Sequence, residues 1–387
     1  MKSITIRDVR LFPIMLPMVE GFTTSFGTLP YKTCVLVRLE TEAGVIGWGE
    51  VSAEVRPGYN SETVATATHV LTEFLIPRVL GQTVTSGTEV PALLHLVRGH
   101  VTAKHGLEGA VWDAIAKTNQ MSLADLFSAY LPEGHESRGY ATVGVSIGIK
   151  PTLDETLQVI EKRLGEGYQR IKLKIKPGWD VELAQGVRDA YPDIVMMLDA
   201  NSAYSLDDAE HLKQLDQFGL LMVEQPLAYN DIYQHSKLQP QLQSPICLDE
   251  SILNANDVRL SLELGACKII NLKPARVGGF TESLEVYKVC VENEMPLWIG
   301  GMLESGVGRA ALLAFASLPG VTLPCDISAT SRYYNPDIAD PPFVLGENST
   351  ITVPTTPGIG VEVQMDRVEE ATTRWQEQYP YTYPPGV

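Results

Sequence analysis

The sequence predicts an α/β protein in which a barrel of alternating strands and helices follows a smaller α+β domain. Two observations support this prediction. Short apolar runs recur at 195–198, 220–223, 246–248 and 269–272, and about 20 residues separate each from the next, which is room for one helix and two loops. Each run ends in one ionisable residue, in the order Asp199, Glu224, Asp249 and Lys273. Such runs are typical of strands buried on both faces of a parallel sheet.

The ionisable strand ends are evenly spaced. Glu224 follows Asp199 by 25 residues, Asp249 follows Glu224 by 25, and Lys273 follows Asp249 by 24. Equal spacing places them at the same end of successive strands, and in an α/β barrel that end carries the chemistry. Eight barrel strands are expected: the four runs above, with others at 141–147, 170–175, 297–301 and, shorter, 321–324.

The first 135 residues predict an α+β domain. Strands are expected at 4–16, 34–39 and 45–50, and the glycine-flanked segment 21–27 is expected as a loop, either a mobile cover or plain surface. Helices are expected from residue 61 and over 106–129, before a helix-breaking segment at 131–134. After about 345, alternating apolar residues at 351–363 predict strands that rejoin the N-terminal sheet, followed by a peripheral helix over 368–378.

Composition argues against several classes of function. The chain has 387 residues, of which 44% are hydrophobic and 20% charged, which is ordinary for a globular protein of two domains. A formal net charge of −17 argues against binding to nucleic acid or to an anionic membrane. Five scattered cysteines without a C-x-x-C pair, no apolar signal segment and no long apolar run predict a cytoplasmic protein that does not span a membrane.

One strand ahead of the carboxylates, residues 170–176 alternate strictly between basic and aliphatic side chains. This period of two sends Lys172 and Lys174 to one face of a strand and the aliphatic residues to the other. Taken alone, such lysines are typical of a solvated strand. The strand ends that follow favour another interpretation, in which both lysines stand beside the acidic residues at the rim of the barrel.

Three carboxylates that converge at one rim repel one another and need compensation. A divalent cation supplies it, and oxygen ligands favour a hard cation. Room for water and substrate favours Mg²⁺, with Mn²⁺ as an alternative, over Ca²⁺. Zinc is disfavoured because no histidine or cysteine lies at a matching strand end. The competing interpretation, that the acids are helix N-caps, accounts less well for three in register between two lysine-bearing strands.

The lysines predict base chemistry. A lysine held near a divalent cation and near another lysine can lose its proton close to neutral pH. A metal that holds a substrate carboxylate stabilises the charge formed when the neighbouring carbon is deprotonated. The residues therefore predict proton abstraction α to the carboxylate of a small molecule.

Essentially the whole chain resembles the muconate lactonizing enzyme subgroup of the enolase superfamily, a superfamily whose members pair a lysine or histidine base with Mg²⁺. The resemblance is carried by the Lys-x-Lys strand and by the motifs at 199–201, 224–226, 249–251 and 271–274. Stretches at 24–27, 47–50, 273–279 and 300–306 resemble o-succinylbenzoate synthases of the N-succinylamino acid racemase type. No histidine follows His235, so the late histidine base of mandelate racemase-like members is missing.

The resemblance implies a modified TIM barrel of the (β/α)7β type over 136–344. It also implies an α+β capping domain formed by residues 1–135 and completed by the C-terminal tail, about 345–387. A homo-oligomer is expected, because this fold family is usually oligomeric.

The resemblance also implies the role of each strand-end residue. Asp199, Glu224 and Asp249 would bind Mg²⁺, Lys174 and Lys273 would stand on opposite faces of the substrate, and Lys172 would tune Lys174. In the synthase reaction one lysine removes the α-proton of a cyclohexadiene carboxylate and helps to expel its hydroxyl group, giving o-succinylbenzoate for menaquinone synthesis. In the racemase reaction both lysines exchange protons with an N-succinylamino acid.

Further residues are candidates for support or substrate contact. Arg276 matches an arginine behind the ligands of the racemase-type enzymes, with a surface helix residue as the alternative. The others are Ser146, Asn201, Glu250, Phe22, Ser25, Tyr59, Gly300 and Gly301. The same ligands and lysines would suit a dedicated N-acylamino acid racemase, a dipeptide epimerase or a muconate cycloisomerase. An inactive metal-binding scaffold would need a broken catalytic position, and the sequence has none.

Overall fold

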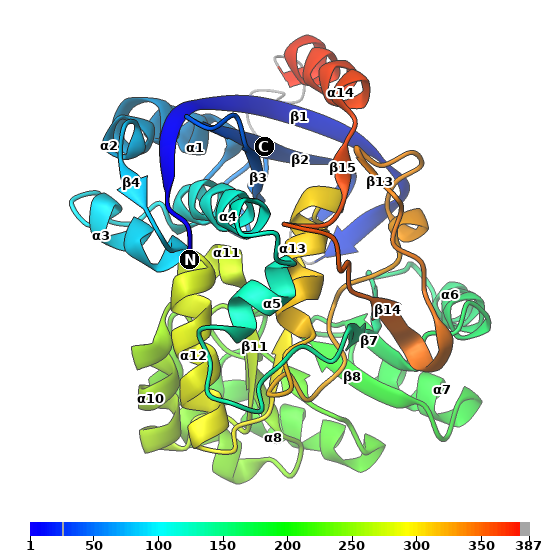
Figure 1. Ribbon diagram of the computed structural model, residues 1–387. Coiled ribbons are helices and arrows are strands. Elements are labelled where there is room, and N and C mark those ends of the chain that lie inside the picture. Colours follow the sequence, from blue (N-terminus) through cyan, green and yellow to red (C-terminus); the bar gives the residue numbers. More distant parts are fainter. Residues whose placement is uncertain (25–26, 380–387) are drawn as a thin grey trace.

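The computed structural model describes residues 1–24 and 27–379. The N-terminal part is a four-stranded sheet in the order β3-β2-β1-β4, formed by β1 (Ile4–Thr24), β2 (Gly27–Thr41), β3 (Ile46–Val51) and β4 (Thr83–Val84). The long hairpin β1–β2 arches over the top of the molecule (Figure 1). Its pairing continues through Phe22 with Leu29 to Thr24 with Gly27. The loop expected at 21–27 is therefore mostly strand, because a register shift after Pro17 lets the hairpin resume pairing.

Five α-helices follow in the capping region: α1 (Val64–Val70), α2 (Ile76–Val79), α3 (Val90–Leu94), α4 (Val101–Thr118) and α5 (Leu123–Ser128). The long helix expected over 106–129 is two helices, since Gln120 has a positive φ of 56° and Ser122 caps a new N-terminus. Helix α4 packs directly on β3. A Cβ added at Gly49 would lie 2.0 Å from the carbonyl oxygen of Gly106, so only glycine permits this approach.

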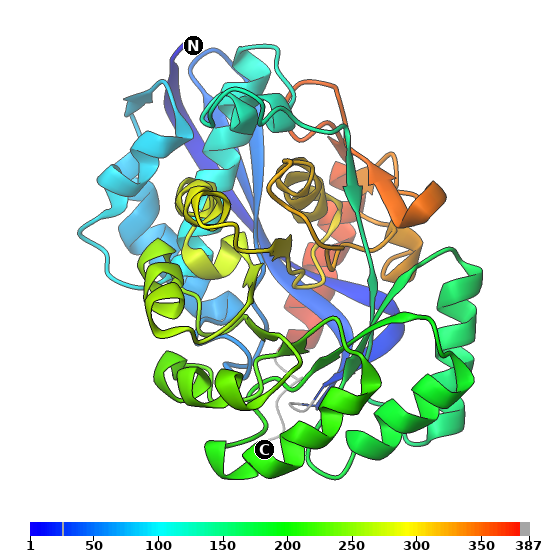
Figure 2. The ribbon, with the colours of Figure 1, turned by 90° about the horizontal axis from the view of Figure 1, so that it is seen from below.

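The barrel contains seven parallel strands in sequential order from β6 to β12. They are β6 (Val145–Ile147), β7 (Arg170–Lys174), β8 (Val195–Asp199), β9 (Val223–Glu224), β10 (Ile246–Leu248), β11 (Ile269–Leu272) and β12 (Leu297–Ile299). The helices are α6 (Leu153–Gly165), α7 (Val181–Ala190), α8 (Ala209–Leu212), α9 (Ile232–Leu238), α10 (Ala255–Leu264), α11 (Pro274–Val277), α12 (Phe280–Glu292) and α13 (Gly306–Ala316). Figure 2 shows these helices, green through yellow, around the strands. The predicted modified TIM barrel with a capping domain is confirmed.

The expected eighth strand is reduced to single bridges. Val321 pairs with Leu297 of β12, and Cys325 pairs with Val143 near β6. Pro324, between them, has no N–H to donate to a ladder. The segment thus closes the gap between the two outer strands without forming a regular strand.

The C-terminal tail joins the cap through a helix. Strand β14 (Thr350–Thr352) pairs with β5 (Tyr140–Thr142), and β15 (Glu362–Val363) pairs with β13 (Ala339–Asp340). The prediction that these strands rejoin the N-terminal sheet is therefore wrong, since segments of two or three residues carry too little pattern to specify a partner. Helix α14 (Met365–Gln378) instead lies against β1 (Figure 1), and Arg374 donates to the Met15 carbonyl oxygen at 3.0 Å. The division into domains at about 135 and 345 stays a prediction.

Candidate active site

The C-terminal ends of the barrel strands bring the predicted residues together. Lys172 and Lys174 lie on β7, Asp199 ends β8, Glu224 ends β9, Asp249 follows β10 and Lys273 follows β11. The register pairs Lys174 with Asp199, and Asp199 with Glu224, on neighbouring strands. All six side chains are buried, with at most 9% of each residue exposed. The interpretation of 170–176 as a solvated strand is therefore wrong.

Each of the three lysines contacts a carboxylate. The Lys174 Nζ lies 2.6 Å from Asp199 Oδ2, and the Lys273 Nζ lies 2.9 Å from Asp249 Oδ2. Lys172 lies between two carboxylates, 3.1 Å from Asp199 Oδ2 and 3.0 Å from Glu224 Oε2. Because β8, β9 and β10 separate β7 from β11, Lys174 and Lys273 flank the carboxylates from opposite sides.

Arg276 and Tyr59 form a second contact with Asp249. Arg276, on α11, has only 6% of its surface exposed and donates to Asp249 and to the Tyr59 hydroxyl. That hydroxyl donates to Asp249 Oδ2 at 2.8 Å and also accepts from Lys273. The alternative of a surface residue at Arg276 is therefore wrong. Tyr59, a candidate for support or substrate contact in the sequence analysis, links the capping region to the barrel rim.

Asn201 and Glu250 lie directly behind the carboxylates. Asn201 Oδ1 accepts from Lys174 Nζ at 2.7 Å, while its Nδ2 donates to Glu250 Oε1 at 3.0 Å. Both side chains are buried, with 6% and 7% of the residues exposed. A second amide, Asn271 on β11, donates to Glu224 Oε1 at 2.7 Å. These contacts orient both a carboxylate and a lysine.

Asp326 is a residue of the site that the sequence analysis missed. It accepts from Ser146 Oγ at 3.0 Å, pairs with Arg170 at 2.7 Å and forms an ion pair with Lys172. Trp298 on β12 lies beneath Lys172, with its ring centroid 5.1 Å from Nζ. The signal was present, because Asp326 follows the expected eighth strand as the other acids follow theirs.

The electrostatics of the carboxylates depend on their cations. Burial alone would raise the pKa of Asp249, but Arg276 and Lys273 hold that pKa below its usual range. Asp199 likewise has a lowered pKa, because Lys174 and Lys172 outweigh the effect of burial. The pKa of Glu224 is raised well above its usual range by burial and then by the charges of Asp199 and Asp249. Burial and Asp249 also raise the pKa of Glu250, to about 7.

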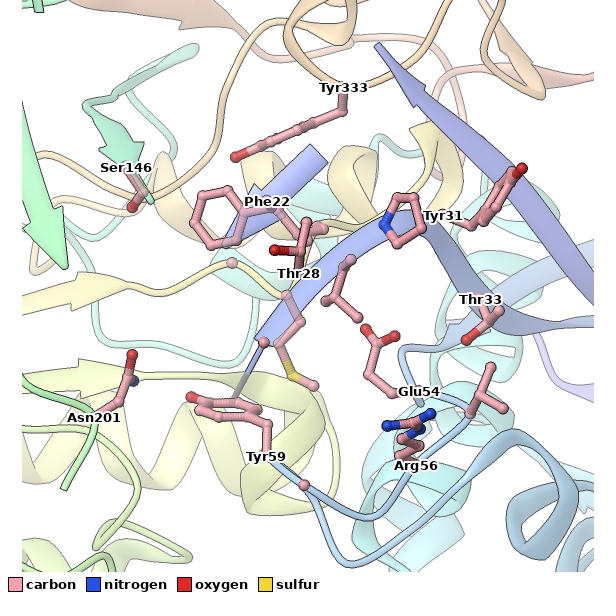
Figure 3. Close-up of a pocket in the computed structure, with 18 of the residues that line it drawn as sticks. Phe22, Thr28, Tyr31, Thr33, Glu54, Arg56, Tyr59, Ser146, Asn201 and Tyr333 are labelled. Carbon is pink, nitrogen blue, oxygen red and sulfur yellow. The ribbon is translucent and has the colours of Figure 1, made fainter. Parts of the chain in front are cut away.

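A cavity of about 530 Å³ opens above this cluster, between the barrel rim and the cap. Figure 3 shows Ser146 and Asn201 on one side of it and Tyr31, Glu54 and Arg56 on the other, with Phe22 and Tyr59 between. Lys172, Lys174 and Lys273 all line it, as does Gly301. Gly300 is next to it, where a Cβ would lie 2.2 Å from Asn271 Oδ1 and 2.5 Å from Lys273 Cε. The predicted Ser25 lies outside the described residues.

Comparisons with known proteins show the family. Residues 6–128 match the model of the mandelate racemase and muconate lactonizing enzyme N-terminal domain, and residues 155–367 match the enolase C-terminal domain-like model. The chain therefore belongs to the enolase superfamily, in its mandelate racemase and muconate lactonizing enzyme group.

Related proteins match this chain over nearly its full length. The chain is 46% identical to an o-succinylbenzoate synthase of Geobacillus kaustophilus, over 96% of each chain. It is 44% identical to an N-succinylamino acid racemase of an Amycolatopsis species, over 94% of this chain and 97% of that one. A crystal structure of an enolase-superfamily member from Listeria innocua superimposes with a TM-score of 0.89 at 38% identity, covering 95% of this chain and 97% of that one.

Enzymes of this family use a divalent metal ion, and the donor set of the site fits one. Three carboxylates from adjacent strands offer only oxygen, which suits a hard cation. Burial raises the pKa of Glu224, and the charges of Asp199 and Asp249 raise it further, an effect that a bound cation would offset. Within residues 1–24 and 27–379, no group of three His, Cys, Asp or Glu side chains is arranged closely enough to hold a metal as it stands. The lysines and Arg276 occupy the carboxylate oxygens instead.

The described helices give no sign of a membrane span, since none of them is both long and apolar enough to cross a bilayer.

Proposed function

We propose that this protein is an o-succinylbenzoate synthase that also racemises N-succinylamino acids. One observation carries the proposal: Lys174 and Lys273 line one cavity from opposite sides of three carboxylates. Such a pair presents a proton donor or acceptor to either face of a carbon held between them. The relatives at 44–46% identity carry both activity names, which supports a dual activity in this chain.

We propose that Asp199, Glu224 and Asp249 hold Mg²⁺, with Mn²⁺ as a substitute. When bound, the ion would hold the substrate carboxylate and stabilise the charge that develops when its α-carbon loses a proton. Asn201, Asn271 and Tyr59 would keep the three carboxylates oriented. For Asn201 the link is its backbone N–H, which donates to Asp199 Oδ1 at 3.0 Å.

The lysines would divide the proton chemistry. One lysine, as a neutral amine, would take the α-proton of the substrate, and the other, as an ammonium ion, would face the opposite side of the same carbon. In the synthase reaction the lysine would take the proton from the α-carbon and help to expel the hydroxyl group, so that proton and hydroxyl leave the substrate as water. Their loss makes the ring aromatic. In the racemase reaction the second lysine would return a proton to the opposite face. Lys172, held between Asp199, Glu224 and Asp326, would fix the charge beside Lys174.

A second candidate is a dedicated N-succinylamino acid racemase. It is favoured by the buried Arg276, which pairs with Asp249 behind Lys273 and matches the racemase-type pattern. A homo-oligomer, a cytoplasmic location and a role in menaquinone synthesis stay predictions that accompany the synthase assignment.

The decisive assay supplies the purified protein with Mg²⁺ and the 2-succinyl-6-hydroxy-cyclohexadiene carboxylate, and follows the loss of its absorbance as o-succinylbenzoate forms. Rapid turnover that is absent from the Lys174→Ala variant supports the synthase. No turnover, from a protein that racemises N-succinylamino acids, transfers the assignment to the dedicated racemase. If the protein shows neither activity, both candidate functions are contradicted.

A further inference from the structure

The two substrates proposed above share a feature that the lysine and carboxylate cluster does not address. Each has one carboxylate next to the reacting carbon and a second carboxylate at the end of a succinyl arm. The first belongs to the chemistry at the barrel rim. The second is a charged group that enters the cavity, and any desolvation of it there is unfavourable unless a cation or several donors receive it.

Arg56 is the cation placed to do so. Of the described residues that line the cavity, four carry a positive charge: Lys172, Lys174, Lys273 and Arg56. The three lysines stand at the barrel rim and contact Asp199, Glu224 and Asp249. Arg56 comes from the cap, and Figure 3 shows it on the side of the cavity away from Ser146 and Asn201.

The charge around Arg56 favours an anion. The neighbouring carboxylate, Glu54, also lines the cavity, but its Oε1 lies 2.9 Å from the Nζ of Lys32, whose side chain is completely buried. The pair of Lys32 and Glu54 is therefore neutral as a unit, and the guanidinium of Arg56 carries its positive charge throughout the physiological pH range.

The apolar part of the cavity lining suits a chain of methylene groups. It includes Leu29, Pro30, Val55 and Met302. Arg56 is also tied to the catalytic end by its own loop, because Tyr59, three residues later, bonds to Asp249 and Lys273. Three residues of chain span at most about 11 Å, so the position of Arg56 relative to the lysines is restricted.

We propose that Arg56 is a specificity-determining residue that binds the terminal carboxylate of the succinyl arm, and that this contact selects succinylated substrates over neutral acyl analogues. The inference rests on the proposed function and deepens it. It also accounts for one cavity serving two reactions, since both substrates offer the same arm to the same cation.

The test compares two substrates of equal shape. The racemisation of N-succinyl-L-phenylalanine and of its succinamoyl analogue, which has a terminal amide in place of the carboxylate, is measured with the wild-type protein and with Arg56→Gln. We expect kcat/KM for the succinyl substrate to fall about ten- to hundredfold in the variant, mainly through KM, because a charge-assisted contact made in both ground and transition states is lost. The succinamoyl substrate should change by no more than about twofold. Arg56→Lys should recover part of the loss, since it keeps the charge but not the two-pronged geometry.

The matched control is Arg98→Gln, an exposed arginine of the cap that does not line the cavity. It should leave both substrates unchanged. Equal losses for the two substrates in Arg56→Gln would show a general effect on the cap and overturn the proposal, as would no loss for either. If the wild-type protein racemises neither substrate and does not form o-succinylbenzoate, the proposed function itself fails and the inference fails with it.

Discussion

Two regions of this molecule bury carboxylates in different ways. At the barrel rim, Asp199 and Asp249 contact lysines and an arginine, and their pKa values are lowered despite burial. At the interface between cap and barrel, Glu50 and Glu108 are equally buried but are held mainly by neutral donors. Burial raises the pKa of each to about 7.

The interface carboxylates serve as anchors. Glu50 on β3 accepts from the Ser305 and Gly308 backbone N–H groups at the start of α13, each at 3.1 Å. Glu108 on α4 accepts from Trp112 Nε1 at 2.8 Å and from the Thr281 backbone N–H at 2.7 Å. Both join the cap to barrel helices near their N-termini, where negative charge is favoured. Cations therefore keep Asp199 and Asp249 ionised at the rim, where the raised pKa of Glu224 is the exception, whereas the interface uses its carboxylates for attachment.

Lys174→Ala should distinguish the two regions most clearly, because it should change activity at the rim strongly and stability very little. Loss of a proton-transfer group should lower synthase turnover by about 10³-fold, within the usual range for a general base, while the midpoint of thermal unfolding stays close to that of the wild type. Steady-state kinetics and a thermal melt measure the two effects. A variant that keeps more than about a tenth of the activity would show that Lys174 is not essential to the chemistry.

Metal removal should also act on the rim alone. Treatment with a chelator should reduce turnover to less than about a hundredth, since charge stabilisation worth several kcal/mol is lost, and Mg²⁺ or Mn²⁺ should restore it. Activity that persists after the chelator, verified by metal analysis, would contradict the assignment of Asp199, Glu224 and Asp249 as ligands.

Glu108→Gln should change the pH dependence of stability. The pKa of Glu108 is raised from 4.5 to about 7, so the folded protein binds this proton more tightly than the unfolded chain. Its stabilising contribution is complete below 4.5 and is lost as the pH rises to about 7. The variant, which cannot ionise, should therefore gain roughly 2–3 kcal/mol relative to the wild type between about pH 5 and pH 8. Denaturant unfolding at both pH values measures this difference in the free energy of unfolding, with a substitution at the exposed Glu133, Glu133→Gln, as control. A difference between variant and wild type that does not change with pH would contradict the raised pKa of Glu108.

Of the two interface substitutions, Glu50→Ala should have the smaller effect on stability. It removes the acceptor for Ser305 and Gly308 but also removes a carboxyl group whose burial is unfavourable, so the two effects partly cancel. We expect a net loss of about 1 kcal/mol at about pH 8, measured by denaturant unfolding. A loss larger in magnitude than the change caused by Glu108→Gln would show that the two effects at Glu50 do not cancel.

The rim was largely predictable from the sequence, and the interface was not. Asp199, Glu224, Asp249 and Lys273 follow regular strands at nearly constant spacing, which reports their shared edge directly. Asp326 was missed because the run before it, at 321–324, is short and interrupted by Thr322 and Pro324, so it lacks the regular apolar pattern that marks the other acids. Glu50 and Glu108 contact residues 255 and 173 positions away, and no local pattern encodes such pairings. The prediction of the sheet that the tail strands join was wrong for a related reason, since segments of two or three residues do not define a register.

The most direct test of the central claim is stereospecific exchange of the α-proton. Each enantiomer of an N-succinylamino acid is incubated in D₂O with Mg²⁺ and with wild-type protein, Lys174→Ala or Lys273→Ala, and deuterium incorporation is followed by NMR. Two lysines on opposite faces predict that the wild type exchanges both enantiomers, while each variant loses exchange with the enantiomer whose α-proton faces the missing lysine, and the two variants lose opposite ones. Exchange of both enantiomers by either variant would contradict the account.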